Sequence, residues 1–176
     1  MRFLWLSNDN NLVNDLKSIK LKVFEDDSLK YEELDIFDFI VKNKFKDFIY
    51  NKQFYKDIDY AIVEQQGKHI GIIGYYTDDG INYWLGWAGI LKEFRHKGYG
   101  LELFKNIEKY LKNKDVKTIR VYTGLEENKN ACEIYKKLGY ILQNGTFELN
   151  GEKDIVIFGK NLDSSNYENW DKEPLW

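Results

Sequence analysis

Cysteine, histidine and proline are scarce in this chain, and their scarcity narrows what the protein can be. A single cysteine, Cys132, excludes a disulfide within the chain. The two histidines, His69 and His96, are too few for the usual zinc-binding clusters, so we expect no metal. The apolar start at residues 1–6 is too short for a signal peptide, and no stretch approaches a membrane span. A cytoplasmic protein is therefore the expectation.

An excess of basic charge is also absent. The formal net charge is −3 and the sequence pI is about 5.5, so neither nucleic acid nor a membrane is an expected partner. Hydrophobic residues make up 43% of the 176 residues and aromatic residues 16%, which is enough to fill one core. We expect one domain over residues 1–162, followed by an acidic, aromatic tail at residues 163–176.

The N-terminal part of the sequence predicts one short strand and two helices. Residues 1–6 suit an edge strand, and Leu12, Val13, Leu16 and Ile19 then recur at helical spacing. Apolar residues repeat every three or four positions from Leu34 onward, which predicts an amphipathic helix that ends near Tyr50.

The period changes to that of strands in the middle of the chain. Residues 60–64 and 70–76 predict two strands joined by a tight turn, and a second turn at residues 77–80 leads into a strand that reaches Leu91. These would be three successive antiparallel strands. Glycines at positions 71, 74, 86 and 89 would weaken them unless they mark bulges or places where another backbone or a ligand comes close.

A basic, glycine-rich turn at residues 95–100 follows this strand and opens into a helix. Gly98 and Gly100 let the backbone approach a ligand, and the first N–H groups of a helix have no partner inside it. The turn therefore suits a phosphate or pyrophosphate, although two glycines at a helix start are also common as plain turn residues.

The rest of the chain predicts a crossover and a hairpin. A helix from Leu101 to about residue 113 leads to a strand at residues 118–123, and such a βαβ unit makes its two strands parallel. A further helix begins near Glu126 and stops at Gly139. Residues 140–149 and 154–162 would then pair through a turn at residues 150–151. The expected class is α+β with a mixed sheet.

Two sequence motifs, placed in order along these predicted elements, resemble the motifs of a known protein family. Arg95-x-x-Gly98-x-Gly100 resembles the acetyl-CoA pyrophosphate loop of the GNAT N-acetyltransferase superfamily. Downstream, the segment from Asn128 through Ala131 and Tyr135 to Gly139-Tyr140 resembles the second signature of the same family. The likeness covers about residues 60–162. It implies a mostly antiparallel sheet with a central parallel βαβ unit and a splayed cofactor cleft.

The resemblance also implies how acetyl-CoA binds as the cosubstrate. Backbone groups of the strand before the turn would bind the pantetheine arm or polarise the thioester, the turn would hold the pyrophosphate, and an asparagine would bond the cofactor near its exit. In chain order, the implied cofactor-binding residues are Ala88, Gly89, Ile90, Arg95, His96, Lys97, Gly98, Tyr99, Gly100, Leu101 and Asn128.

Tyr135 resembles the family tyrosine that protonates the departing thiolate, although its place on an apolar helix face also fits a core residue. No general base is assigned, because the strand before the turn has no carboxylate and the next strand ends in Thr123. Four carboxylates qualify by type, and each also fits an ordinary turn or surface position: Glu64, Asp78, Asp79 and Glu126.

Three functions follow in order of preference. The first is an N-acetyltransferase that moves the acetyl group from acetyl-CoA to a primary amine by direct attack in a ternary complex. The second is an acyl-CoA-binding or sensor module without catalysis, which the missing carboxylate favours. The third is a purely structural or interaction role, for which the aromatic tail from Tyr167 to Trp176 is the only special support. That tail would close over the sheet, cover the partner in a homodimer, or be disordered.

The acceptor would be a small molecule or a peptide, bound by residues 7–58. Acidic side chains of this part would attract a cationic amine or simply form a solvated helix face: Glu25, Asp26, Asp27, Glu32, Glu33 and Asp35.

Overall fold

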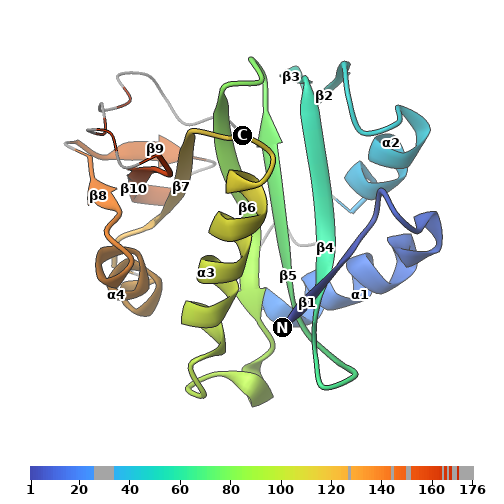
Figure 1. Cartoon of the computed structure of the whole chain (residues 1–176), viewed down its shortest axis with the longest axis horizontal. Helices are drawn as coiled ribbons and strands as arrows, with labels where there is room; N and C mark the ends of the chain where they lie inside the picture. The colour runs from blue at the N-terminus through green and yellow to red at the C-terminus, as the bar shows by residue number, and fades with distance from the viewer. Residues whose placement is uncertain are drawn as a thin grey trace.

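The computed structural model describes residues 1–25, 34–126, 128–143, 145–149, 152–163, 165, 167 and 170. Its main feature is an eight-stranded mixed sheet with the order β1-β4-β5-β6-β7-β10-β8, in which β9 also pairs with β10 (Figure 1). A separate two-stranded sheet joins β2 and β3. The predicted class is confirmed. In the described part of the chain, no helix is both long and apolar enough to cross a membrane.

The N-terminal elements confirm one predicted helix and correct the other. β1 (Arg2–Trp5) pairs with β4 at the sheet edge, and α1 (Val13–Val23) follows the short 3-10 turn η1 (Asn10–Leu12). The second helix, α2, spans only Ile36–Lys42, so the predicted extension to Tyr50 is wrong.

The chain leaves α2 because several residues after it adopt the left-handed backbone region, among them Lys44, Phe45 and Asp47. The residues expected to continue the helix form β2 (Phe48–Tyr50), which pairs with β3 (Gln53–Tyr55). Phe48 and Tyr50 are buried and Ile49 between them is exposed, so this stretch follows the two-residue period of a strand.

The central strands are antiparallel, as predicted. β4 (Asp57–Gln65) and β5 (Lys68–Thr77) are joined by a tight turn at Gln66 and Gly67, both with positive φ, and β5 pairs with β6 (Asn82–Ile90). From Gly86 to Gly89 β6 contains one more residue than the facing part of β5, from Ile72 to Gly74. This is a β-bulge at Trp87 and Ala88.

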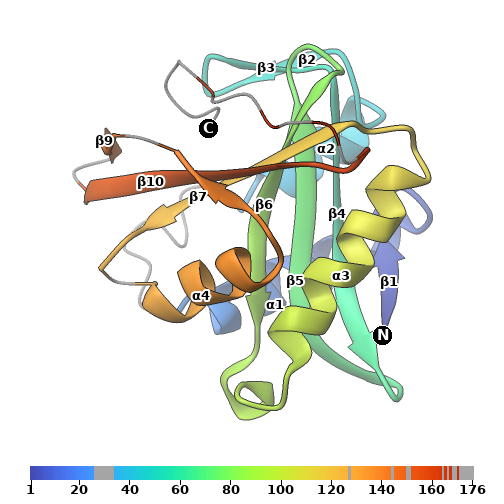
Figure 2. The same cartoon turned by 60° about the vertical axis from the view of Figure 1, so that its left-hand side comes forward.

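The predicted βαβ crossover is also confirmed. The 3-10 turn η2 (Lys92–Phe94) leads to α3 (Tyr99–Lys112), and β7 (Thr118–Gly124) returns parallel to β6. Within the described residues the parallel pairing covers Asn82–Trp84 and Thr118–Arg120 and then ends. Beyond that point β7 stays paired with β10 through Gly124, and the two strands turn away from β6 (Figure 2).

The C-terminal elements differ in part from the predicted hairpin. α4 (Lys129–Lys137) ends before Gly139, whose φ of 79° allows the left-handed stop. The first arm of the hairpin is divided into β8 (Ile141–Leu142) and β9 (Phe147–Leu149), and both pair with the long β10 (Glu152–Asn161). The predicted turn at residues 150–151 lies outside the described residues.

Each face of the sheet has its own hydrophobic core (Figures 1 and 2). On one face, α3 and α4 pack through their buried residues Leu103, Phe104, Ile107, Leu111, Cys132 and Tyr135. On the other face, α1 and α2 pack through Leu16, Ile19, Val23, Ile36, Phe37 and Ile40. The divergence of β6 and β7 therefore lies between two pairs of helices.

Candidate active site

The site is built around the point where β6 and β7 part. Trp84 and Arg120 are the last paired residues, and from Leu85 to Ile90 the described residues place no strand beside β6 on the β7 side. The backbone N–H and C=O groups on that edge are therefore free of ladder hydrogen bonds. Such an edge can pair with an extended ligand by main-chain hydrogen bonds.

The β-bulge lies within this unpaired part of β6. Trp87 has a φ of 41°, which is unusual for a residue other than glycine and is held there by the surrounding structure. The bulge redirects the backbone of Ala88 and Gly89 relative to a regular strand. It coincides with the positions that the resemblance assigns to the pantetheine arm and the thioester.

Close packing explains the glycines near the bulge, with the predicted backbone approach at Gly71 and with side chains, which were not predicted, at Gly74 and Gly89. A Cβ atom at Gly89 would lie 2.3 Å from Cγ1 of Val23 in α1, and one at Gly71 would lie 2.2 Å from the carbonyl oxygen of Gly89. A Cβ at Gly74 would lie 2.1 Å from the ring of Tyr60. These glycines therefore let α1, β5 and β6 come together behind the bulge.

The glycine loop, residues 95–100, leads from the end of β6 to the start of α3. Gly98 is the N-cap of α3 with a φ of 81°, and His96 also has a positive φ of 61°. A Cβ atom at Gly98 would meet nothing within 4 Å, so the loop has open space beside its backbone. The first N–H groups of α3 face out of the helix end, where an anion is favoured.

Two basic side chains of the glycine loop bond to the protein itself. Arg95 Nε donates to the carbonyl oxygen of Ile90 at 2.8 Å, and its Nη2 donates to that of Val23 at 2.9 Å. Lys97 Nζ donates to the carbonyl oxygen of Glu93 at 2.9 Å. Arg95 thus joins the loop to β6 and α1, so any effect on a bound phosphate comes through loop position or long-range charge.

Asn128 and Tyr135 lie at the two ends of α4. Asn128 is its exposed N-cap residue and makes no capping hydrogen bond with its side chain. Tyr135 is buried against the rings of Phe104, Tyr140 and Phe158, and burial raises the pKa of its phenol, which keeps it protonated near neutral pH. Its hydroxyl makes no hydrogen bond to any described residue.

The candidate bases are all engaged elsewhere or remote from the unpaired edge. Glu64 pairs with Arg2 at 3.0 Å on the outer strands, and Glu126 pairs with Lys129 at 2.9 Å. Asp79 accepts hydrogen bonds from the backbone of Ile81 and Asn82 in the turn before β6. Asp78, in the same turn, has a buried Oδ1 without a partner among the described residues.

No group of three or more potential metal ligands occurs in the described ranges.

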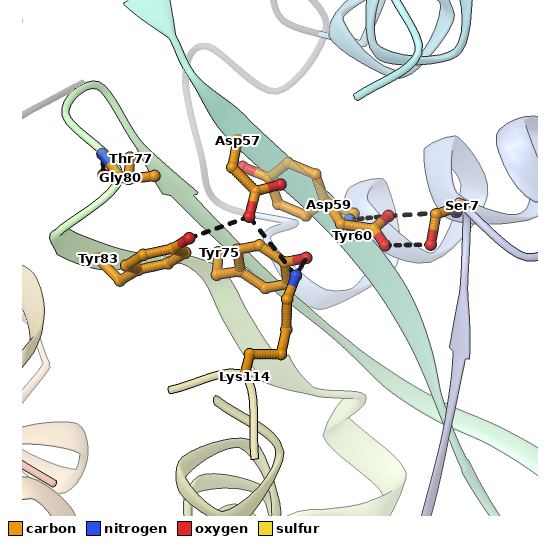
Figure 3. Close-up of polar contacts among 9 residues, drawn as sticks. All are labelled: Ser7, Asp57, Asp59, Tyr60, Tyr75, Thr77, Gly80, Tyr83 and Lys114. Atoms are coloured by element: carbon orange, nitrogen blue, oxygen red, sulfur yellow. Dashed lines mark hydrogen bonds and ion pairs between the residues drawn. The ribbon is translucent and has the colours of Figure 1, made fainter. Parts of the chain in front are cut away.

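A polar network that the sequence analysis did not single out lies at the far end of α3 (Figure 3). Lys114 donates to the hydroxyl of Tyr75 and lies 3.5 Å from Asp57, which also accepts a hydrogen bond from Tyr83. Nearby, Asp59 is 2% exposed and accepts a 2.6 Å hydrogen bond from the Ser7 hydroxyl. These contacts fasten β1, β4, β5 and β6 to the end of α3, opposite the glycine loop.

The comparison that decides the family is a match to the family model described as "Acetyltransferase (GNAT) family", which covers residues 22–140. The chain belongs to the GNAT acetyltransferase family. The predicted family and fold are thereby confirmed, and the unpaired edge of β6 is the place where the GNAT resemblance puts the cofactor. No curated protein sequence matches the chain significantly.

Solved GNAT structures share the fold at low sequence identity. An aminoglycoside 6′-acetyltransferase type Ii matches with a TM-score of 0.65 and 17% identity, over 92% of this chain and 97% of that chain. An aminoglycoside 6′-N-acetyltransferase complexed with coenzyme A matches with a TM-score of 0.61 and 17% identity, over 92% and 97%. A GNAT acetyltransferase from Elizabethkingia anophelis with acetyl-CoA bound matches with a TM-score of 0.50 and 17% identity, over 59% and 76%.

Sequence reasoning missed the residues that line the α1/α2 face of the divergence. Trp84 and Arg120 each contact the ring of Trp170 there. Lys20 of α1 is fully buried, with its Nζ 5.1 Å from the centre of the Trp87 ring. The sequence offered one signal for these residues. Arg120 is a charged residue between the apolar Ile119 and Val121 in a buried strand, and a buried charge needs a partner.

Proposed function

We propose that this GNAT protein transfers the acetyl group of acetyl-CoA to a primary amine by direct attack in a ternary complex. The observation that carries the proposal is the unpaired, bulged edge of β6, which runs directly into the glycine loop and the start of α3. An extended pantetheine arm fits such an edge, and a pyrophosphate fits a helix N-terminus with open space at Gly98.

The backbone would do most of the binding. Ala88, Gly89 and Ile90 would bond the pantetheine amides and polarise the thioester carbonyl, which needs donors fixed in place before reaction. His96 to Leu101 would contribute N–H groups to the pyrophosphate, with Arg95 holding the loop in position through Ile90 and Val23. Asn128, with its free amide, would bond the cofactor where it leaves the protein.

Acetyl-CoA supplies an activated acetyl group. The neutral amine nitrogen forms the new C–N bond, the C–S bond breaks with its electron pair on sulfur, and the nitrogen loses one proton. Tyr135 would give its phenolic proton to the thiolate as the C–S bond breaks, and the phenolate would regain a proton from water. Burial raises the pKa of this phenol, so Tyr135 is protonated before the reaction begins. The amine proton would leave through water, because the described part of β6 and the end of β7 at Thr123 present no carboxylate.

The same missing carboxylate favours a second candidate, an acyl-CoA-binding or sensor module without turnover. The two functions share the cofactor site and differ in the fate of the acetyl group. Because matching structures include aminoglycoside acetyltransferases, small-molecule amines form the first acceptor panel.

The test combines binding with turnover. Acetyl-CoA should raise the melting temperature of the protein, and thiol release should follow when an accepted amine is added. Stabilisation without thiol release across the whole panel would favour the sensor, and no stabilisation at millimolar acetyl-CoA would exclude both.

The proton donor is tested by Tyr135→Phe, which should lower kcat about 100-fold or more while acetyl-CoA still binds. Tyr140→Phe is the matched control, because Tyr140 is equally buried and its ring contacts that of Tyr135 at 5.8 Å. Equal activity of the Tyr135→Phe protein and the wild type under chemistry-limited conditions would remove Tyr135 from the mechanism.

A further inference from the structure

Two hydrogen-bond donors lie together at the apex of the β6/β7 divergence. Trp84 and Arg120 are cross-strand neighbours at the last paired position, and both side chains contact Trp170 on the α1/α2 face. The centroids of the Trp84 and Trp170 rings are 5.6 Å apart, and Arg120 Cζ lies 4.6 Å from the Trp170 ring. This is the face opposite α3 and α4, from which an acceptor could reach the thioester.

The indole N–H of Trp84 has no partner among the residues that the structure describes. Trp84 is fully buried, and its Nε1 makes no hydrogen bond within the described part of the chain. A buried donor without an acceptor is costly to keep, and it often marks a place where a ligand or an ordered water supplies the missing oxygen. The donor belongs to β6 itself, on the strand that leads to the bulge.

Arg120 is the second donor. It is 5% exposed, and its Nη1 donates to Asn82 Oδ1 at 2.6 Å while its Nε donates to the Tyr167 hydroxyl at 3.0 Å. No described carboxylate lies within ion-pair distance of the guanidinium. The nearest acidic link is indirect, since Asn82 donates in turn to Asp79. A buried guanidinium with neutral partners favours an incoming anion, above all a planar carboxylate.

The tail residues Tyr167 and Trp170 cover this pair of donors. Gly159 leaves the space for Tyr167, because a Cβ there would lie 1.9 Å from the Tyr167 hydroxyl oxygen. Gln143 fixes both tail residues, as it accepts a hydrogen bond from the Tyr167 hydroxyl and donates to the carbonyl oxygen of Trp170 at 2.7 Å. Tyr167 and Trp170 are thus seated over β7 and β10, where they form a wall beside Trp84 and Arg120.

We infer that the acceptor of this enzyme carries a carboxylate, which Trp84 Nε1 and Arg120 bind under the ring of Trp170. The inference rests on the proposed acetyltransferase function, because it places the amine of the same molecule at the thioester. An acceptor with several ammonium groups and no acid, such as a polyamine or an aminoglycoside, is disfavoured beside the buried charge of Arg120.

The strand geometry sets the distance between the carboxylate and the reacting amine of the acceptor. Trp84 precedes the bulge at Trp87 and Ala88 by three or four residues, which corresponds to about 10 Å along a strand. An α-amino group lies too close to its own carboxylate to span that length. The acceptor class is therefore an ω-amino acid, or a molecule such as lysine whose distal amine is separated from the carboxylate by several bonds.

The first experiment measures thiol release from acetyl-CoA with two matched series. One is the ω-amino acids from glycine to 6-aminohexanoate, and the other is the n-alkylamines of equal carbon number. We expect kcat/KM to rise with chain length in the acid series and to exceed that of the matched alkylamine by at least about tenfold at the longer members. Equal values in the two series, or a preference for spermidine and aminoglycosides, would overturn the inference while leaving the acetyltransferase function intact.

The second experiment identifies the binding groups. Trp84→Phe removes the N–H and keeps an aromatic ring, and Arg120→Gln removes the charge. Each should raise the KM for 6-aminohexanoate about tenfold or more and leave the KM for hexylamine and for acetyl-CoA unchanged. A change of equal size for both amines would mean that these side chains are only structural.

The third measurement needs no turnover. Hexanoate with coenzyme A should raise the melting temperature of the wild type more than hexylamine does, and Trp84→Phe should abolish the difference. A positive result would support the carboxylate site even if no amine were acetylated, and the absence of any difference would overturn it.

Discussion

The guanidinium of Arg95 donates a 2.9 Å hydrogen bond to the carbonyl oxygen of Val23, 72 positions earlier in the chain. Val23 is the last residue of α1, so this carbonyl lacks a helical partner and sits at the negative end of the helix dipole. The same guanidinium bonds Ile90 at the end of β6. The Arg95 side chain therefore links three elements: the glycine loop, the bulged strand β6 and the end of helix α1.

Arg95→Ala should loosen the glycine loop. We expect a loss of about 1 kcal/mol in the free energy of unfolding and a rise of about tenfold in the KM for acetyl-CoA, with kcat less affected. Lys97→Ala is the control, since the Lys97 ammonium bonds the carbonyl oxygen of Glu93 and contacts the Phe94 ring, both in the adjacent turn. Urea unfolding and initial rates measure the two effects, and identical behaviour of the two variants would mean that Arg95 does not position the loop.

Gly89→Ala should destabilise the protein through a clash with α1. The new Cβ would lie 2.3 Å from Val23 Cγ1, and relieving such an overlap costs about 1–3 kcal/mol. Val23→Ala removes that methyl group, so the double variant should be more stable than the sum of the two single changes predicts. Gly67→Ala, where no atom lies within 4 Å, is the matched control, and Val23→Ala should not rescue it. Purely additive urea unfolding energies in the first pair would contradict the predicted contact.

Asp59 should make the fold less stable as the pH rises. Burial raises the pKa of this carboxyl from 3.8 to about 6, so the folded state holds the proton more tightly than the unfolded state does. The free energy of unfolding therefore falls between about pH 4 and pH 6, by about 3 kcal/mol from this group alone, and the loss is complete above the folded pKa.

Asp59→Asn should remove that part of the pH dependence, because the amide stays neutral and can still bond Ser7 and Tyr60. Urea unfolding at pH 4.5 and pH 7.5 compares the variant with the wild type and with Asp15→Asn on the exposed surface of α1. If all three proteins lost stability equally over this range, Asp59 would not be the responsible group.

Gly159→Ala should displace Tyr167 from the sheet. The added Cβ would overlap the hydroxyl oxygen of Tyr167 at 1.9 Å, and Arg120 and Gln143 would then lose a shared partner. Initial rates should show that the KM for the amine increases more than that for acetyl-CoA. In a Tyr167→Gly background the same change should have little further effect, and a full effect there would disprove the clash.

Local sequence patterns were enough to predict the family, the glycine loop, the βαβ crossover and the motif from Asn128 to Tyr135. Each depends on a short run of residues whose turn chemistry or periodicity is local, as with the left-handed Gly98 before α3 and Gly139 after α4. Cofactor roles assigned to those residues stay predictions, since they come from the family resemblance.

The fold, and not the local sequence, sets where β6 and β7 part, that Arg95 bonds Val23, and that Phe48–Tyr50 form a strand instead of a helical turn. It also brought Tyr167 and Trp170 onto the face of Arg120 and Trp84. These features arise from contacts between residues far apart in the chain. A local pattern fixes the type of an element, but packing against distant elements selects which edges stay open and which charges are buried together.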